Sequence, residues 1–143
     1  MSEPKEFSKE AQRVLFLANE ESKRLKSPHV ASEHLLLGAL AHRFSTVSKA
    51  LEESGLTLQG LRGYISSQVG SMPEEAPHGY GPSMHRVLRS SCQHSDALSH
   101  REVGPEHLVL GLLDELEGGA CRALKHFGVD VPATRQRILD TFG

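Results

Sequence analysis

The chain has 143 residues, enough for one domain with a substantial core, and its formal net charge is −2. This balance argues against a protein that binds nucleic acid or a bare membrane surface. No apolar run approaches the roughly 18–20 residues of a membrane-spanning helix, and the polar start MSEPKEFSKE does not resemble a secretory signal. Cys92 and Cys121 have neither metal-binding nor disulfide spacing, so we expect reduced thiols, a cytoplasmic protein and no metal or cofactor.

The sequence repeats itself at an offset of 73 residues, most clearly in SEHLLLGAL (residues 32–40) and PEHLVLGLL (residues 105–113). No gap is needed, and the offset pairs identical residues throughout, including Arg13 with Arg86, Val14 with Val87, Leu25 with Leu98, Val30 with Val103, Glu33-His34-Leu35 with Glu106-His107-Leu108, Gly38 with Gly111, Gly55 with Gly128, Arg62 with Arg135 and Ile65 with Ile138. This agreement indicates an internal duplication, and two copies are too few for a solenoid. We predict one domain over residues 1–143, with repeat 1 at about 7–70, a linker at 71–79 and repeat 2 at about 80–143.

Apolar residues at helical spacing predict four helices in the first repeat. Ser8 is placed to cap a long helix that ends near Leu25. A short apolar helix then starts at Glu33. The third helix ends at Gly55, which suits a left-handed C-cap, and Thr57 is placed to cap the fourth.

The second repeat is expected to follow the same order. Pro82 stands near the first position of its long helix, where a missing N–H costs least. The short helix starts at Glu106, the third helix ends at Gly128, and Asp130 caps the fourth. No alternating pattern predicts a strand, so the fold class is all-α, with about eight helices in two pseudo-twofold-related four-helix repeats.

Two pairs of segments resemble a known family. FSKEAQRVLFLANEESKRL followed by ASEHLLLGAL resembles the first repeat of the Clp N-terminal domain, and MHRVLRSSCQHSDAL followed by GPEHLVLGLLDELEGGACRALKHFGVD resembles the second. The likeness covers about residues 7–143 and is nearest to the ClpC type. It implies a non-enzymatic module of the Clp proteolysis system that binds substrates, adaptors or proteins marked with phosphoarginine.

The ATPase modules of that system are not expected in this chain. No G-x-x-x-x-G-K-[ST] sequence is present, so we expect no ATP hydrolysis by a P-loop. The start at Met1 and the lack of a linker after Gly143 favour a stand-alone protein, with the N-domain of a longer chain as the alternative. A stand-alone copy would regulate the ATPase or sequester cyclic-peptide antibiotics.

Glu33 and Glu106 are the candidate ligand-binding residues of the repeated motif. Each is expected in the first turn of its short helix, where backbone N–H groups lack partners and the helix dipole is positive. A phosphate binds such amides, and a carboxylate binds a guanidinium through two charge-assisted hydrogen bonds. The resemblance implies that both glutamates bind phosphoarginine in this way, although a glutamate at this position also stabilises its helix without a ligand.

Other candidate residues around the glutamates are unevenly preserved. Ser32 keeps the hydroxyl of the family's Thr-Glu-His triplet, whereas Pro105 has none. Ser8 keeps the hydroxyl found near the start of each long helix, whereas Gly81 does not. Where the family often has a basic residue, this chain has Ser83 or the methionine after it. The motif elements of the first copy are therefore more intact than those of the second. Because a complete site can draw elements from both copies, the sequence does not decide which site fails, and we expect at most one good phosphoarginine site, or weaker binding overall.

His34 and His107 directly follow the two glutamates and belong to the same candidate set. Adjacent helical residues point about 100° apart, so a Glu-His pair is not ready to bind a metal. The expected role of both histidines is a buried hydrogen bond.

Two functional alternatives stay open. A small enzyme would use Glu33 or Glu106 with a histidine or Cys92, and a docking domain would bind an ATPase ring without using the glutamates. The acidic run at residues 114–119 is expected to be a solvated helix end or an adaptor contact. Phe44 is expected in the core, with an exposed partner contact as the alternative.

Overall fold

The computed structural model describes residues 5–43, 45–68, 79–115 and 117–142. Its elements follow the chain in this order: β1 (Glu6–Phe7), α1 (Lys9–Arg24), α2 (Ser32–Ala41), α3 (Thr46–Glu53), α4 (Leu58–Gln68), α5 (Pro82–Ala97), β2 (Glu102–Val103), α6 (Pro105–Asp114), α7 (Gly119–His126) and α8 (Val131–Asp140). Each of α5 to α8 starts 73 residues after its counterpart among α1 to α4. The eight helices of the described residues confirm the expected fold class, while Phe44 and the linker, apart from Gly79, lie outside these residues.

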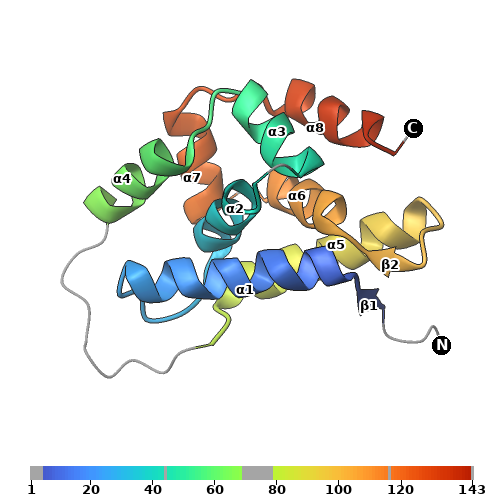
Figure 1. The fold of residues 1–143 in the computed structure, drawn as a ribbon, viewed down its shortest axis with the longest axis horizontal. Helices are drawn as coiled ribbons and strands as arrows, with labels where there is room; N and C mark the ends of the chain where they lie inside the picture. The colour runs from blue at the N-terminus through green and yellow to red at the C-terminus, as the bar shows by residue number, and fades with distance from the viewer. Residues whose placement is uncertain (1–4, 44, 69–78, 116, 143) are drawn as a thin grey trace.

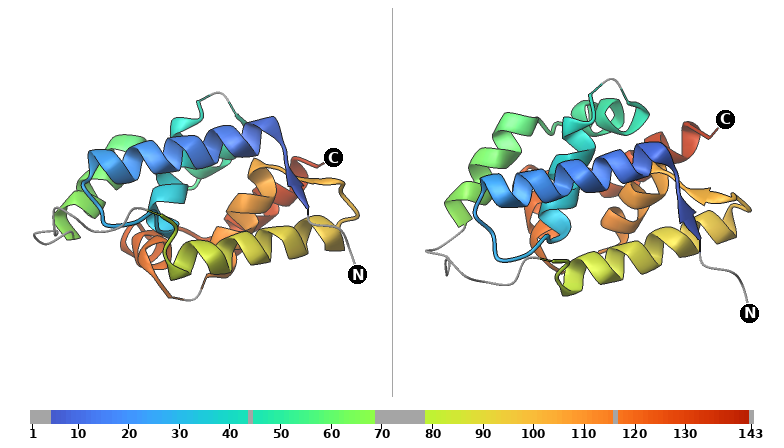
Figure 2. Two further views of the ribbon diagram at one scale, coloured as in Figure 1. Left: turned by 90° about the horizontal axis from the view of Figure 1, so that it is seen from below. Right: turned by 60° about the horizontal axis from the view of Figure 1, so that its bottom comes forward.

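The two short helices α2 and α6 occupy the centre of the molecule (Figure 1). The long helix α1 packs mainly on α2, and α5 packs mainly on α6. Figure 2 shows α1 and α5 flanking this central pair. The outer helices contact partners from the other repeat, since α3 packs on α8 and α4 packs on α7. The two repeats are therefore interlocked and do not form two separate bundles.

The core is one aliphatic cluster that both repeats share. Its centre comes from α2 and α6, which are apolar on nearly every side and so need to be buried all round. Their fully buried leucines are Leu35, Leu36, Leu37, Leu40, Leu108, Leu110 and Leu112. Within the described parts of the chain, no helix combines the length and hydropathy needed to cross a membrane.

The conserved spacing of Gly38 and Gly111 in the two copies has a packing reason. A Cβ atom on Gly38 would lie 2.5 Å from the carbonyl oxygen of Val14 in α1. A Cβ atom on Gly111 would lie 2.7 Å from the carbonyl oxygen of Val87 in α5. Glycine is therefore needed in both short helices, because each touches the backbone of its long neighbour.

Two short strands depart from the expectation of a purely helical chain. Glu6–Phe7 pairs in parallel with Glu102–Val103, and Val30 forms a bridge to Tyr80 at the equivalent place in the duplicated structure. Strands of two residues are too short to leave an alternating pattern in the sequence. Both pairings join one repeat to the other, so they add to the interlocking.

The helix ends largely follow the expected signals. Gly55 and Gly128 have φ angles of 102° and 67° and follow the ends of α3 and α7. The side-chain caps expected at α1, α4 and α8 are present: Ser8, Thr57 and Asp130. Helices α2 and α6 begin at Ser32 and Pro105, one residue before the two glutamates.

Candidate functional site

His34 and His107 stabilise the first turns of α2 and α6, as expected for buried hydrogen bonds. The Nδ1 atom of His34 accepts from the N–H of Ala31 at 2.8 Å, and that of His107 accepts from the N–H of Gly104 at 2.8 Å. The side chain of each histidine therefore accepts a hydrogen bond from the backbone N–H of the residue that precedes its helix, as in a capping box. Since Nδ1 is the acceptor, the proton of the neutral ring is on Nε2.

The second ring nitrogen of His107 donates to the Nδ1 atom of His100 at 2.8 Å. The His107 ring also stacks on Phe142 and is 4 % exposed. Burial and the neighbouring His100 lower the pKa of His107 to about 4, although the negative charge of Glu106 acts to raise it. At neutral pH His107 is an uncharged structural group.

Ser32 joins three helices from both repeats. Its N–H donates to the Oγ atom of Ser83 in α5 at 3.0 Å, and its own Oγ accepts from the N–H of Ala120 in α7 at 3.1 Å. The side chain is fully buried. The hydroxyl that the sequence suggested as a ligand contact is thus a helix cap between the repeats.

Glu33 lies in the first turn of α2 and faces a cavity of about 280 Å³. Its side chain is 17 % exposed. Burial raises the pKa of Glu33, while the charge of Arg122 opposes this shift. The carboxylate packs on Gly119 at the start of α7, where a Cβ atom would lie 1.2 Å from Oε2. The glutamate of repeat 1 therefore faces a helix of repeat 2.

Glu106 faces the matching helix of the other repeat. Its Oε2 atom accepts a hydrogen bond from the hydroxyl of Thr46, the first residue of α3, at 2.8 Å. The surrounding cavity measures about 820 Å³ and is also lined by Ser8, Arg43 and Arg101. Each cavity is thus built across the repeat boundary.

Because each cavity draws residues from both repeats, motif residues of one copy are divided between the two cavities. Ser8 and Ser32 belong to the same copy in sequence, but Ser8 lines the cavity of Glu106 and Ser32 lies beside Glu33. The counterpart of Ser8 near Glu33 is Gly81, where the ring of His29 lies 2.3 Å from the position of a Cβ atom. The motif elements of the first copy are therefore divided between the two cavities, and the cavity of Glu33 is not the more complete of the two.

The first turn of α2 has no unoccupied N–H group. The N–H of Ser32 donates to Ser83, and the N–H of Glu33 donates to its own carboxylate. The N–H of His34 donates to the carbonyl of Ala31 at 3.0 Å. Side chains and the N-cap carbonyl thus accept from the amides of this turn, so a phosphate there would have to replace these acceptors.

The first turn of α6 differs from that of α2. Pro105 has no N–H, so this turn has one backbone donor fewer than the first turn of α2. Glu106 and His107 both line the cavity of about 820 Å³. An anion in that cavity would lie near the positive end of the α6 dipole.

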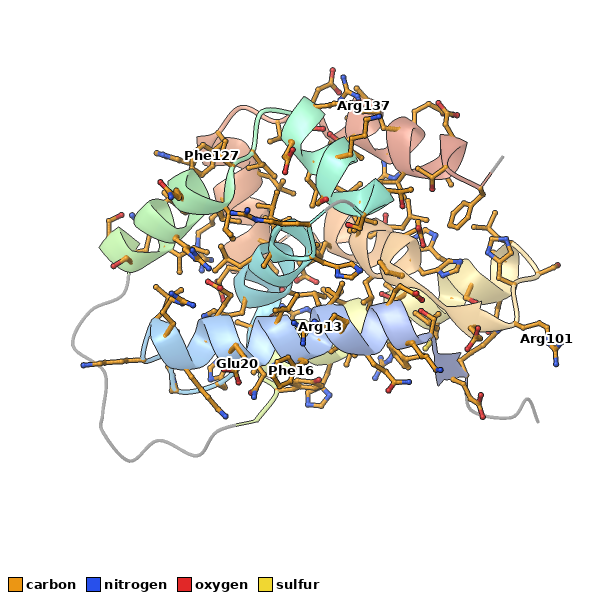
Figure 3. The ribbon with its side chains drawn as sticks, in the orientation of Figure 1. Arg13, Phe16, Glu20, Arg101, Phe127 and Arg137 are labelled. Atoms are coloured by element: carbon orange, nitrogen blue, oxygen red, sulfur yellow. The ribbon has the colours of Figure 1, made fainter. Side chains whose placement is uncertain are left out.

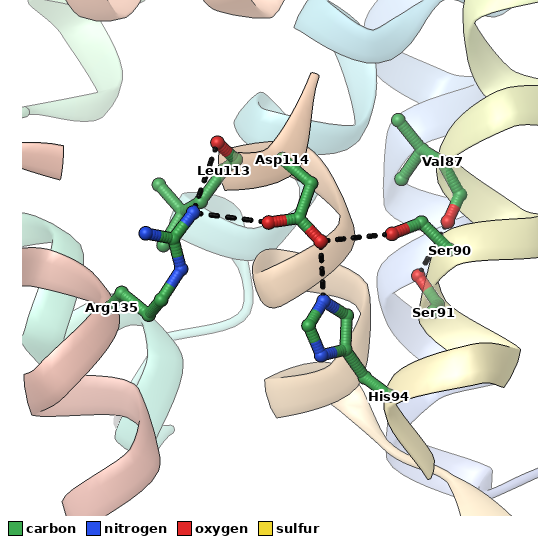
Figure 4. Close-up of polar contacts among 7 residues, drawn as sticks. All are labelled: Val87, Ser90, Ser91, His94, Leu113, Asp114 and Arg135. Atoms are coloured by element: carbon green, nitrogen blue, oxygen red, sulfur yellow. Dashed lines mark hydrogen bonds and ion pairs between the residues drawn. The ribbon is translucent and has the colours of Figure 1, made fainter. Parts of the chain in front are cut away.

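The acidic run begins at Asp114, the last residue of α6, which is exposed as expected and also makes side-chain contacts (Figure 4). Asp114 accepts hydrogen bonds from Ser90 at 3.1 Å, His94 at 2.5 Å and Arg135 at 3.0 Å. Burial alone would raise the pKa of Asp114, but these partners hold it below its usual value. Asp114 therefore ties α5, α6 and α8 together.

The next acidic residue is also a structural group. Glu115 is 9 % exposed, and its Oε1 atom accepts two hydrogen bonds from the guanidinium of Arg86, at 2.8 and 3.0 Å. The expectation of a solvated helix end holds for Glu117, which is exposed, and is wrong for Glu115. Sequence reasoning missed the pair because the arginine comes from another helix.

Two of the groups invoked for a small enzyme are Cys92 and a histidine beside Glu33. Cys92 is a free, half-buried thiol whose pKa is raised by burial and by Asp96. A raised pKa lowers the thiolate fraction, which is the reactive form. The ring of His34 uses Nδ1 as an acceptor and contacts Ser27 through Nε2 at 2.9 Å. Among the described residues, no cluster of three or more histidine, cysteine or acidic side chains is placed to hold a metal.

Three residues around the glutamates were not suggested by the sequence. Thr46 lies against Glu106, while Tyr64 and Arg122 line the cavity of Glu33. None of the three has an identical residue at the 73-residue offset. The duplication pointed to the two glutamates, but it gave no information about these three neighbours.

The sequence matches known proteins over nearly its whole length. The Clp repeat (R) N-terminal domain matches residues 6–99 and 80–143. The ClpA homolog of Cyanidium caldarium, the ATP-binding subunit of an ATP-dependent Clp protease, is 36% identical over 141 residues. The Bacillus subtilis protein named negative regulator of genetic competence ClpC/MecB is 36% identical over 139 residues. Each alignment covers 96% of this chain, which spans only 16% and 17% of the length of these relatives.

Solved structures show the same fold. The N-terminal domain of ClpD from Arabidopsis thaliana has a TM-score of 0.80 at 24% identity, covering 96% of this chain and 97% of that one. The Hsp104 N-terminal domain from Candida albicans has a TM-score of 0.80 at 16% identity, covering 97% and 93%. The chain therefore belongs to the Clp repeat (R) N-terminal domain family, the protein-interacting and non-catalytic N-terminal domains of Clp ATPases.

Proposed function

We propose that this domain captures proteins that carry phosphorylated arginine, and that the cavity of Glu106 is the binding site. The observation that carries the proposal is the combination of a carboxylate with a helix N-terminus, a hydroxyl and two arginines in one cavity. Phosphoarginine has a guanidinium-type group beside a phosphate, so a site for it needs both. The same reasoning favours one working site in the chain.

The carboxylate of Glu106 supplies the part that recognises the guanidinium-type group. It is half-buried, and Thr46 already orients one of its oxygens through the 2.8 Å hydrogen bond. A planar group with parallel N–H donors binds such a carboxylate through two charge-assisted hydrogen bonds. Binding need not break the contact with Thr46, because each carboxylate oxygen accepts more than one hydrogen bond.

The phosphate would be held by groups around the same carboxylate. The first turn of α6 and the hydroxyl of Ser8 both line the cavity. Arg43 and Arg101 add positive charge at the exposed margin of the cavity. Helix N-termini and arginines are the usual protein partners of a phosphate.

We also propose that Clp ATPases, their adaptors and their substrates are the partners, and that the domain works in the cytoplasm. The relatives named as Clp subunits support the first proposal, and the free thiols of Cys92 and Cys121 fit a reducing compartment. The alternative is a domain that regulates ClpC or sequesters cyclic-peptide antibiotics, or that docks on an ATPase ring. A docking domain would bind the ring equally well after Glu106→Gln.

Calorimetric titration with free phosphoarginine tests the proposal, with arginine and inorganic phosphate as control ligands. We expect saturable binding with one site per chain. Loss of a charged hydrogen-bond partner costs about 1.5–3 kcal/mol, so Glu106→Gln should weaken binding about tenfold or more. Ser8→Ala should weaken it less, and Glu33→Gln is the matched control that should leave it unchanged. Absence of binding at millimolar phosphoarginine would refute the proposal and leave the fold assignment intact.

A further inference from the structure

The loop that joins α5 to β2 forms one wall of the Glu106 cavity. His100 and Arg101 belong to this loop, and both line the cavity. Figure 3 shows Arg101 projecting from the loop at the edge of the molecule. Ser99 has a φ angle of 60°, in the left-handed region that residues other than glycine seldom adopt. Contacts from elsewhere in the chain must therefore hold the loop in this conformation.

Lys5, which precedes β1, supplies such a contact. Its ammonium group donates to the carbonyl oxygen of His100 and forms an ion pair with Asp96 of α5, with 3.0 Å between Nζ and Oδ1. The side chain of Lys5 is only 18 % exposed, although a lysine usually keeps its ammonium group in water. One lysine of repeat 1 therefore joins the end of α5 to the loop of repeat 2.

The backbone that follows Lys5 extends this attachment along β2. The two strands pair in parallel, with Phe7 opposite Val103, and the N–H of Ser8 donates to the carbonyl of Val103 at 2.9 Å. A pairing of two residues is marginal by itself, so the side-chain contacts of Lys5 add to its stability. Ser8 itself lines the cavity. The segment therefore connects the loop to a second wall of the same cavity.

The ring of His100 connects the loop to the first turn of α6. Its Nδ1 atom lies 2.8 Å from the Nε2 atom of His107, and the ring packs on Phe142 with 4.7 Å between the centroids. His107 directly follows Glu106. A movement of His100 would therefore disturb the turn that carries the carboxylate and would displace the neighbouring Arg101.

The duplication does not repeat this lysine. At the offset of 73 residues Lys5 corresponds to His78, which lies outside the described residues. His100 corresponds to Ser27, in the loop before α2. The lysine contact therefore belongs to the cavity of Glu106 alone in the sequence pattern.

We infer that Lys5 is a positioning residue for the Glu106 cavity: it holds His100 and Arg101 in place for an anionic ligand. Lys5 is not one of the described residues that line the cavity, so it acts through the loop and does not touch the ligand. The inference rests on the proposed capture of phosphoarginine. It adds that the segment before α1 controls the affinity of that site.

Two variants separate positioning from a simple effect of charge. Lys9→Met removes an equal charge at the exposed start of α1, so a general field effect would weaken binding there too. Asp96→Asn removes a negative charge, which by charge alone would strengthen the binding of an anion. If Asp96 anchors Lys5, the same substitution weakens binding instead. The sign of the change in affinity therefore distinguishes the two explanations.

The experiment is an amide-detected NMR titration of the intact chain with phosphoarginine at about 150 mM salt, where the screening length is about 8 Å. Lys5→Met keeps most of the aliphatic chain and should weaken binding about two- to fivefold, the range expected for one partly exposed ion pair. Lys5→Arg keeps the charge and the N–H donors, so it should bind within about twofold of the unaltered protein. Asp96→Asn should weaken binding about twofold, and Lys9→Met is the matched control that should leave it unchanged.

Amide hydrogen exchange of the same samples without ligand tests the loop directly. The N–H of His100 donates to the carbonyl of Ser95 at 2.9 Å, and the N–H of Ser8 is hydrogen-bonded across the strand pair, so both are protected. In Lys5→Met we expect both to exchange about two- to fivefold faster. The amides of the buried helix α2 should keep their exchange rates, and they show whether a variant is destabilised as a whole.

Several results would overturn the inference. These are unchanged affinity in Lys5→Met, an equal loss in Lys9→Met, tighter binding in Asp96→Asn, a loss in Lys5→Arg as large as that in Lys5→Met, or unchanged exchange of His100 and Ser8. If the unaltered protein binds no phosphoarginine, the proposed function fails and the inference falls with it. If the unaltered protein and Lys5→Met bind equally well, the inference alone fails.

Discussion

Acidification should destabilise the domain through His107, whose neutral ring caps α6. In the unfolded chain a histidine has an ordinary pKa of about 6.5, whereas in the folded protein the pKa of His107 is about 4. Between these values the unfolded state binds the proton and the folded state does not. The stability from the neutral cap is therefore fully present above pH 6.5 and is lost as the pH falls towards 4.

The size of the effect follows from the two pKa values. Across the whole window the shift corresponds to about 3 kcal/mol, and by pH 5 about 2 kcal/mol of this is lost. Solvent screening reduces this little, because the ring is 4 % exposed. The physical cause is that a proton on Nδ1 would break the hydrogen bond from the N–H of Gly104 and bury a charge beside His100.

Urea unfolding at pH 7.5 and pH 5.0 measures this loss, with His107→Gln as the informative variant. Glutamine at this position still offers an acceptor to the residue before the helix, but it does not titrate. The difference in unfolding free energy between the two pH values should be about 2 kcal/mol smaller in His107→Gln than in the unaltered protein. His85→Gln, at an exposed histidine, is the control and should not change the difference. A change below about 0.5 kcal/mol in His107→Gln would show that the buried ring does not govern the acid response.

Two further predictions concern packing and use the same unfolding assay. Gly38→Ala should destabilise the domain by about 1–3 kcal/mol, because the new Cβ atom would lie 2.5 Å from the backbone of Val14. Gly63→Ala is the control: this position on α4 faces open space, so the substitution should be neutral or stabilising. Equal stability of the two variants would contradict the close helix contact. Ser32→Ala should cost about 1–2 kcal/mol because it leaves the buried N–H of Ala120 without an acceptor. Unchanged stability would mean that this link between the repeats is not needed.

The sequence and the structure agree best where the determinants are local. The spacing of apolar residues, the capping hydroxyl of Ser8 and the glycines after α3 and α7 act within a few residues of the chain. The constant offset of 73 residues also predicted that the two repeats contain matching helices. The order of the helices, the fold class and the placing of Glu33 and Glu106 in first turns could therefore be predicted from residue patterns alone.

The site itself could be predicted only in part. The glutamates were found because the duplication marks them, and the hydrogen-bonding role of His34 follows from its place in the helix. The roles of Ser32 and Glu115 were not found, because their partners come from the other repeat or from another helix. No pattern along the chain encodes such a contact.

By itself, the sequence determined the helices, their caps and the duplication, because these depend on interactions between near neighbours. Only the tertiary structure decided which helix faces each glutamate. The reason is that the repeats interlock, so the first turn of α7 faces Glu33 and that of α3 faces Glu106. Two nearly identical motifs thus acquired different surroundings, with Gly119 beside one glutamate and Thr46 beside the other.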